Sequence, residues 1–304
     1  MAPQKQSRKI TIAGTGNVGS QILSALLAQG IHEVSVITRT ESKSTFPEGV
    51  HKVHRGSYDD EAFLVAALQG QDVLVTPISW AAVDTQVALF KAAAKAGVPY
   101  VLPDEFGSDN DNEKLRSQLG ALLGPKDKYR ALVEELGVSA WIGVITNPWI
   151  DFLVPMFWPG NFKERTAVLY GEGDTKANFS TRADVGKGVA ALLSLPEAEL
   201  AQYKNKYVHL SSFHVTQREV LESAMRATGT KEADWTIEKV DLEEQLKTAS
   251  GEARKGNMMA AVTELIGNTF RPGYGGDYQH KVVDYDHLGV QTEKLDDVMK
   301  RVLA

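Results

Sequence analysis

One short segment near the start of the chain restricts the possible fold more than any other feature. Gly14, Gly16 and Gly19 form a Gly-x-Gly-x-x-Gly pattern, which follows the β-rich run Lys9–Ala13 and opens the amphipathic helical pattern Asn17–Gln29. In this position the first glycine permits a tight turn, the second lets the backbone approach a pyrophosphate, and the third lets helix and strand pack closely. Free amides and the positive end of the helix dipole then bind phosphate, so the segment predicts a dinucleotide site. A glycine-rich turn without a ligand is the alternative.

The rest of the first half alternates apolar runs with amphipathic segments. We predict strands at Lys9–Ala13, Glu33–Thr38, Val50–His54, Asp72–Thr76, Val98–Leu102 and Val138–Thr146, and helices at Asn17–Gln29, Asp60–Leu68, Val83–Ala96 and Lys128–Leu136. This alternation predicts an α/β fold with a doubly wound parallel sheet of Rossmann type.

The end of the second predicted strand bears on which dinucleotide binds. A site for NAD usually carries Asp or Glu about 20 residues after the glycines, where it binds the ribose 2′-hydroxyl. Here the strand ends at Thr38 and Arg39, and a guanidinium suits a 2′-phosphate. Lys43 offers a second positive charge, although it could equally be a solvated lysine. Tyr58 offers a ring that could stack on the adenine, although its segment could equally be a plain turn. The sequence predicts NADPH as the cofactor.

Charge and composition exclude several classes of function. The 304 residues include 33 Lys and Arg against 39 Asp and Glu, a net charge of −6, and no cysteine. A net acidic chain argues against nucleic-acid and anionic-membrane partners, and the lack of cysteine excludes disulfides, thiolate metal sites and a cysteine nucleophile. The histidines show no ligand spacing, so we expect them on the surface and expect no metal site.

The sequence pattern indicates neither a targeting segment nor a membrane-spanning segment. Residues 1–9 are polar and lack the apolar core of a signal peptide. Residues 137–160 are mostly apolar, but three prolines interrupt them, so we expect a strand followed by an aromatic loop. These features favour a cytoplasmic protein, and we expect it to be a monomer or a homodimer.

The rhythm of the sequence changes after about residue 147. We predict a flexible tail over 1–8, an NADP-binding domain over 9–150, and a lobe over 151–304 that mostly binds substrate. Elements near 180–212 are expected to return to the first domain, so the lobe is discontinuous.

Four further segments are typical of one family. They are Ala96–Gly107, Lys126 with Arg130–Glu134, Tyr170–Gly173 and Ala183–Gly186. With the glycine loop they make the chain resemble the isoflavone-reductase-like branch of the NmrA-like, atypical short-chain dehydrogenases, over about residues 9–300. The resemblance implies NADPH-dependent reduction of a small, usually aromatic natural product in secondary metabolism.

The resemblance also implies a catalytic lysine, eleven residues before a Gly-Val pair. Counting back from Gly137 identifies Lys126, with Lys128 as second choice. No Tyr-x-x-x-Lys pair is present, so a lone lysine would supply the proton. If Pro125 begins a helix, the positive helix end and burial both disfavour the ammonium form of Lys126. Two departures from the family pattern are Asp104, where the family has serine, and the Gly-Pro pair just before Lys126.

Other site residues are expected at the carboxyl ends of the parallel strands, where ligands bind in such sheets. The predicted cofactor-binding residues are Gly14, Thr15, Gly16, Asn17, Val18, Gly19, Thr38, Arg39, Lys43, Tyr58, Pro77, Ser79, Phe106 and Asn147. The predicted substrate-binding residues are Trp80, Trp149, Phe152 and Trp158, because an aromatic cluster can line a flat apolar pocket. A core or an oligomer interface would use the same aromatics.

Three functions fit this pattern. The first is an NADPH-dependent reductase with Lys126 as proton donor. The second is a regulator that senses dinucleotides without turnover, and the third is an isomerase or cyclase without net redox. The glycine-rich segment 271–276 is either a lid or a plain connector.

Overall fold

A seven-stranded parallel sheet forms the larger part of the molecule. The computed structural model describes residues 5–283 and 285–304, without the side chains of Trp80 and residues 120–125. The sheet has the order β10-β6-β5-β4-β1-β2-β3, and all of its neighbouring strands are parallel. Its strands are β1 (Lys9–Ala13), β2 (Glu33–Thr38), β3 (Lys52–Arg55), β4 (Val73–Val75), β5 (Tyr100–Leu102), β6 (Ala140–Ile145) and β10 (Lys206–His209).

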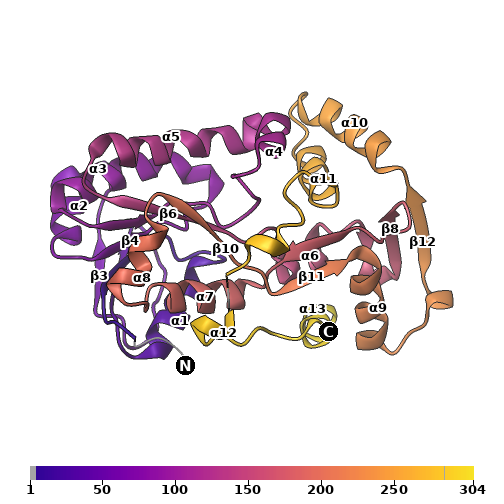
Figure 1. The fold of residues 1–304 in the computed structure, drawn as a ribbon, viewed down its shortest axis with the longest axis horizontal. Coiled ribbons are helices and arrows are strands. Elements are labelled where there is room, and N and C mark those ends of the chain that lie inside the picture. The colour runs from indigo at the N-terminus through magenta and orange to yellow at the C-terminus, as the bar shows by residue number, and fades with distance from the viewer. Residues whose placement is uncertain (1–4, 284) are drawn as a thin grey trace.

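Helices cover both faces of this sheet (Figure 1). One layer contains α2 (Glu61–Leu68), α3 (Gln86–Ala96) and α5 (Gly120–Leu136), and the other contains α1 (Gly19–Gln29), α7 (Arg182–Leu192) and α12 (Tyr285–Leu288). The strands β2, β4 and β5 are buried on both sides, which explains their nearly continuous apolar sequences. The fold is therefore the predicted Rossmann-type α/β fold.

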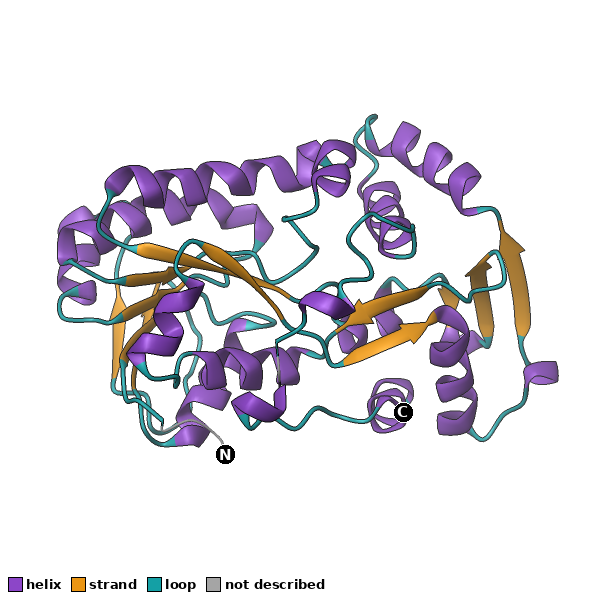
Figure 2. Cartoon of the chain, viewed as in Figure 1, coloured by secondary structure: helices purple, strands orange, loops and turns teal. Residues whose placement is uncertain are grey.

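A smaller lobe lies beside the carboxyl ends of the strands (Figure 2). It contains two small sheets and its own apolar core. One sheet pairs β8 (Thr166–Tyr170) with β7 (Gly160–Asn161) and β12 (Thr236–Val240), and the other pairs β9 (Lys176–Phe179) with β11 (Phe213–Thr216). Its helices are α6 (Ile150–Met156), α9 (Gln217–Thr228), α10 (Leu242–Ala253), α11 (Met258–Thr269) and α13 (Leu295–Leu303).

The chain crosses between the two parts more than once. It passes from β6 into α6 and the smaller lobe, returns for α7, α8 (Glu197–Leu200) and β10, and leaves again at β11. In the returning segment, α7 packs against α1. The short helix α4 (Glu113–Gln118) precedes α5.

Local pattern placed most of the first-half elements to within a few residues. β1 and β2 have the predicted bounds, and Asp60 caps α2 by accepting a hydrogen bond from the backbone N–H of Phe63. The predicted start of the fourth helix at Lys128 is wrong, because α5 already begins at Gly120. The aromatic loop predicted after β6 is also wrong, since that segment contains α6, whose proline lies one residue before its end.

Among the described residues, no helix combines the length and the apolar character that crossing a bilayer requires.

Candidate active site

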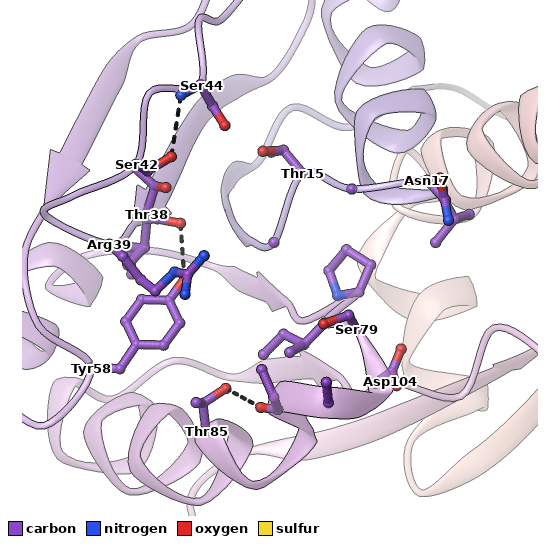
Figure 3. Close-up of a pocket in the computed structure, with 18 of the residues that line it drawn as sticks. Thr15, Asn17, Thr38, Arg39, Ser42, Ser44, Tyr58, Ser79, Thr85 and Asp104 are labelled. Carbon is purple, nitrogen blue, oxygen red and sulfur yellow. Dashed lines mark hydrogen bonds between the residues drawn. The ribbon is translucent and has the colours of Figure 1, made fainter. Parts of the chain in front are cut away.

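A cavity of about 600 Å³ lies at the carboxyl ends of the central strands. Segments that follow β1, β2, β4, β5 and β6 contribute to it, on both sides of the point where the strand order reverses, between β1 and β4. Ligands bind at this position in open parallel sheets. The residues that line it are Gly14, Thr15, Gly16, Asn17, Val18, Ile37, Thr38, Arg39, Ser42, Ser44, Tyr58, Pro77, Ile78, Ser79, Ala81, Ala82, Thr85, Asp104 and Trp149 (Figure 3).

The glycine loop forms the middle of the cavity. Gly14 has a φ of +109°, and a Cβ on Gly19 would lie 2.1 Å from the carbonyl oxygen of Gly14. A Cβ on Gly16 would meet no other atom within 4 Å, so this backbone faces open space. No side chain caps the N-terminus of α1, and the amides of Ser20 and Gln21 donate to the carbonyl oxygens of Gly16 and Val18. The amides that precede Ser20 are therefore the ones available to an anion. The loop therefore fits a pyrophosphate.

One end of the cavity carries an exposed cation. Arg39 follows β2 and pairs with Glu41 at 3.4 Å, with 70 % of each side chain exposed. Such an exposed pair contributes little stability, so the guanidinium can exchange partners readily. Ser42 and Ser44 line the same end, while the side chain of Lys43 between them is exposed to solvent and does not line the cavity.

Tyr58 completes this end from the segment after β3. Its hydroxyl donates a hydrogen bond to the carbonyl oxygen of Ile37 at 3.2 Å. Burial raises the pKa of Tyr58 to about 12, so the ring remains neutral at physiological pH. Its hydroxyl is already engaged, which leaves the ring to contact a ligand.

The opposite end of the cavity is lined by Ser79 after β4 and Asp104 after β5 (Figure 3). Trp149, which follows β6, also lines the cavity. Burial raises the pKa of Asp104 to about 6, and the charge of Lys126 partly opposes this effect. Sequence analysis treated Asp104 only as a departure from a family motif. Its position as the second residue after a fully buried strand was the signal that it faces the carboxyl edge of the sheet.

Lys126 lies beside this end and does not line the cavity. Its Nζ donates a hydrogen bond to the carbonyl oxygen of Glu105 at 2.8 Å, and its side chain is partly buried. Because α5 begins at Gly120, Lys126 falls in the second turn of the helix. The expected contribution of the helix dipole is therefore wrong, since that effect is confined to the first turn.

A buried ion-pair network supports the same region. The carboxylate of Glu105 accepts hydrogen bonds from Arg130 and Asn110, and Arg130 also pairs with Asp127. The side chains of Glu105 and Arg130 are 2 % and 9 % exposed. This network joins the segment after β5 to α5, so it places Asp104 and Lys126 relative to each other.

Two of the predicted cofactor-binding residues are buried away from the cavity. Phe106 is 4 % exposed and belongs to the core beneath the main sheet. Asn147 is buried, and its Nδ2 donates hydrogen bonds to the carbonyl oxygens of Gly276 and Asn178 at 2.9 and 3.1 Å. The structure thus places Asn147 as a link between the end of β6 and the smaller lobe.

The predicted substrate-binding aromatics separate into different environments. Trp149 lines the cavity, and Phe152 packs against it with ring centroids 6.2 Å apart. Trp158 is 4 % exposed and lies in the core of the smaller lobe, against Phe179 and Phe270. The side chain of Trp80 lies outside the part of the chain that the structure describes.

The glycine-rich segment 271–276 is held from two sides. Asn147 binds its end, and Asn112 donates a hydrogen bond to the carbonyl oxygen of Gly273 at 3.2 Å. None of its residues lines the cavity.

His209 lies near this segment in a cluster of charges. The expectation that it lies on the surface is wrong, because it is 5 % exposed and its Nε2 lies 3.2 Å from Asp109. Asp111 is close enough to form a candidate ligand group with them. Lys281 already contacts both carboxylates, at 3.4 Å for Asp109 and 3.0 Å for Asp111, so its ammonium group offsets part of their negative charge.

Comparisons with known proteins agree over nearly the whole chain. The model of the NmrA-like family matches residues 6–271. Oxidoreductase aprR of Aspergillus flavus is 31 % identical over 97 % of this chain and 98 % of its own. A phenylcoumaran benzylic ether reductase of Ginkgo biloba is 27 % identical over 86 % of this chain and 87 % of its own. A solved structure described as AtPrR2 with NADP⁺ and (+)pinoresinol aligns with a TM-score of 0.81 and 20 % identity, covering 98 % of this chain and 99 % of that one.

Proposed function

Because the chain belongs to the NmrA-like family and is an NADPH-dependent oxidoreductase of isoflavone-reductase-like type, we propose that it reduces a small aromatic or enone-type natural product. The observation that carries this proposal is the cavity, which runs from Arg39, past the glycine loop, to Asp104 and Trp149. Its length and chemistry suit an extended dinucleotide with room for a second molecule at the end beside Trp149.

Different residues of the chain would bind different parts of the cofactor. Amides of the glycine loop and the start of α1 would hold the pyrophosphate. Arg39 would give up its exposed pairing with Glu41 to bind the 2′-phosphate through paired hydrogen bonds. Tyr58 would contact the adenine, and Pro77 and Ser79 would border the nicotinamide end. Bound NADPH supplies the hydride from C4 of its nicotinamide.

Trp149 would form one wall of the substrate site. Its ring lines the cavity, and its Nε1 donates a hydrogen bond to Thr146 Oγ1 at 3.1 Å, which fixes the indole. Phe152 supports it from behind. A fixed aromatic wall favours a flat aromatic ligand through offset or edge contacts.

Lys126 would donate the proton that balances the hydride. Its Nζ is held by one carbonyl oxygen, that of Glu105, at the same end as Asp104. The flexible lysine stem would let the ammonium exchange this partner for an oxygen of the substrate. A positioned acid contributes typically about 10²–10⁴-fold to the rate.

The test measures NADPH oxidation against a panel of aromatic enones, quinones, ketones and benzylic ethers. We expect turnover with at least one compound, and we expect Lys126→Met to lower it at least about 100-fold while NADPH affinity changes less than about twofold. Lys128→Met is the matched control, since Lys128 pairs with Asp84 at the exposed surface. An unchanged rate in Lys126→Met would refute its role, and tight NADPH binding without turnover on any compound would favour the sensor or isomerase alternatives.

A further inference from the structure

Asp104 is the one carboxylate among the described residues that line the cavity. It lies at the end opposite Arg39, beside Ser79 (Figure 3). If Arg39 binds the 2′-phosphate, an extended dinucleotide places its nicotinamide at the Asp104 end. We propose that the carboxylate of Asp104 is a cofactor-positioning group that binds the oxidised, cationic nicotinamide in preference to the reduced, neutral one. This inference rests on the proposed function.

The backbone of Asp104 is held while its side chain remains unengaged. Its backbone N–H donates a hydrogen bond to Gln86 Oε1 at 2.8 Å, and that buried oxygen also accepts from Thr76 Oγ1 at 3.1 Å. Within the described part of the chain, no protein donor forms a hydrogen bond with the Asp104 carboxylate. A partly buried carboxylate without a partner is costly, so this group is suited to a ligand that carries positive charge.

The charges around Asp104 leave its own charge largely uncompensated. Lys126 of α5 attracts it but directs its Nζ to the carbonyl oxygen of Glu105. The neighbouring carboxylate of Glu105 repels it, although Arg130 of α5 pairs with that group. Burial raises the pKa of Asp104 to about 6, so the carboxylate is mostly ionised at neutral pH and mostly protonated at pH 5.

The expected consequence is a bias between two cofactor states that differ by one charge. An ionised Asp104 attracts the cationic nicotinamide ring of NADP⁺. The nicotinamide ring of NADPH is neutral, so the carboxylate does not attract it in this way. At an effective dielectric constant of about 40, between the values for a protein surface and for water, opposite charges about 6–8 Å apart attract by about 1–1.4 kcal/mol. Since about 1.4 kcal/mol is tenfold in affinity, we expect a preference of about fivefold to tenfold. The same field would favour the positive charge that develops as hydride leaves the ring.

The experiment compares Asp104→Asn with the wild type by isothermal titration calorimetry. The ligands are NADP⁺, NADPH and ADP-ribose 2′-phosphate, which keeps the 2′-phosphate and the pyrophosphate but lacks the nicotinamide ring. At about pH 7.5 we expect the variant to bind NADP⁺ about fivefold to tenfold more weakly, with NADPH and ADP-ribose 2′-phosphate changed less than twofold. Asp174→Asn removes an exposed charge outside the cavity and should change none of the three.

A pH series separates charge from shape. For the wild type, the ratio of NADP⁺ to ADP-ribose 2′-phosphate affinity should rise by a similar factor between about pH 5 and 7.5, because Asp104 ionises over this range. The ratio cancels the titration of the 2′-phosphate, whose own pKa is about 6. In Asp104→Asn the ratio should stay flat.

Several outcomes would overturn the inference. Equal changes in NADP⁺ and NADPH affinity would indicate a steric role for Asp104, and a parallel loss of ADP-ribose 2′-phosphate affinity would indicate a distorted site. A ratio in the variant that still rises with pH would assign the charge to another group. If wild-type protein bound none of the three ligands, the proposed function itself would fail, whereas normal binding with an unchanged ratio would refute only the role of Asp104.

Discussion

The Gly16→Ala variant separates the stability of the glycine loop from its capacity to bind a dinucleotide. A methyl group at this position would meet no other atom within 4 Å, and Gly16 is not among the glycines with positive φ. Replacing glycine by alanine at such a position typically stabilises a protein by about 0.4–1 kcal/mol, because the unfolded chain loses conformational freedom. In a chain of this size, that gain corresponds to a rise of about 0.6–1.6 °C in the Tm of the free protein.

The same methyl group should weaken NADP⁺ binding, because it occupies the space through which a pyrophosphate reaches the backbone amides. We expect at least a tenfold loss of affinity, or about 1.4 kcal/mol. At a ligand concentration about 100 times the wild-type Kd, binding stabilises the wild type by about 2.7 kcal/mol, so the variant should retain at most about half of this. Thermal unfolding followed by fluorescence, with and without NADP⁺, measures both effects.

The Gly19→Ala variant is the matched comparison, because Gly19 is required for packing. In Gly19→Ala, the new Cβ would lie 2.1 Å from the carbonyl oxygen of Gly14 and 2.8 Å from Pro77 Cγ. We expect the free protein to lose about 1–3 kcal/mol of stability through overpacking. If NADP⁺ instead raised the Tm of Gly16→Ala by as much as it raises that of the wild type, the pyrophosphate would not approach Gly16. The orientation proposed for the cofactor would then be wrong.

Three further predictions test other parts of the structure. Arg39→Ala should reduce the preference for NADP⁺ over NAD⁺ by about 10–100-fold, a loss of about 1.4–3 kcal/mol as expected for a charge-assisted phosphate contact, as measured from the two Kd values; an unchanged ratio would assign the 2′-phosphate elsewhere. Arg130→Met should lower the free energy of unfolding by about 3–5 kcal/mol in urea titrations, because it leaves the buried carboxylate of Glu105 without its cation; a loss below about 1 kcal/mol would contradict this. Burial, and next the charge of Arg8, lower the pKa of His32 from 6.5 to about 4, so the unfolded chain binds the proton first and stability should fall as pH decreases from about 6.5 to about 4. His32→Gln should make that decline shallower in urea titrations across this range, and an identical pH dependence would refute the assignment.

The elements that the sequence predicted well are those fixed by local pattern. The glycine spacing, the strands β1 and β2, and the cap at Asp60 depend on residues within one or two turns of each other. The parallel sheet followed because double-sided burial makes such strands apolar throughout. The cavity-lining residues of the glycine loop were predictable for the same reason, since the loop lies between two recognisable elements.

The predicted site residues that do not line the cavity depend on contacts between distant segments. Asn147 follows a strand in the way a cofactor-binding residue would, but its amide binds the carbonyl oxygen of Gly276, far along the chain. Trp158 and Trp149 belong to one aromatic run, yet only Trp149 lines the cavity, while α6 carries the chain on into the core of the smaller lobe. Nothing in a local pattern distinguishes these outcomes, because both environments select the same residue types.

The buried pair of Glu105 and Arg130 connects the two ionisable groups of the proposed site, Asp104 and Lys126. Glu105 directly follows Asp104. Its backbone carbonyl oxygen accepts a hydrogen bond from Lys126, and its carboxylate accepts one from Arg130. A buried ion pair is weak evidence for stability, because apolar residues of similar volume often replace one without loss. Its directional hydrogen bonds, however, hold the segment after β5 at a set position on α5. We therefore interpret this pair as the feature that keeps Lys126 and Asp104 at the same end of the cavity, and expect substitutions there to alter catalysis even where stability is recovered.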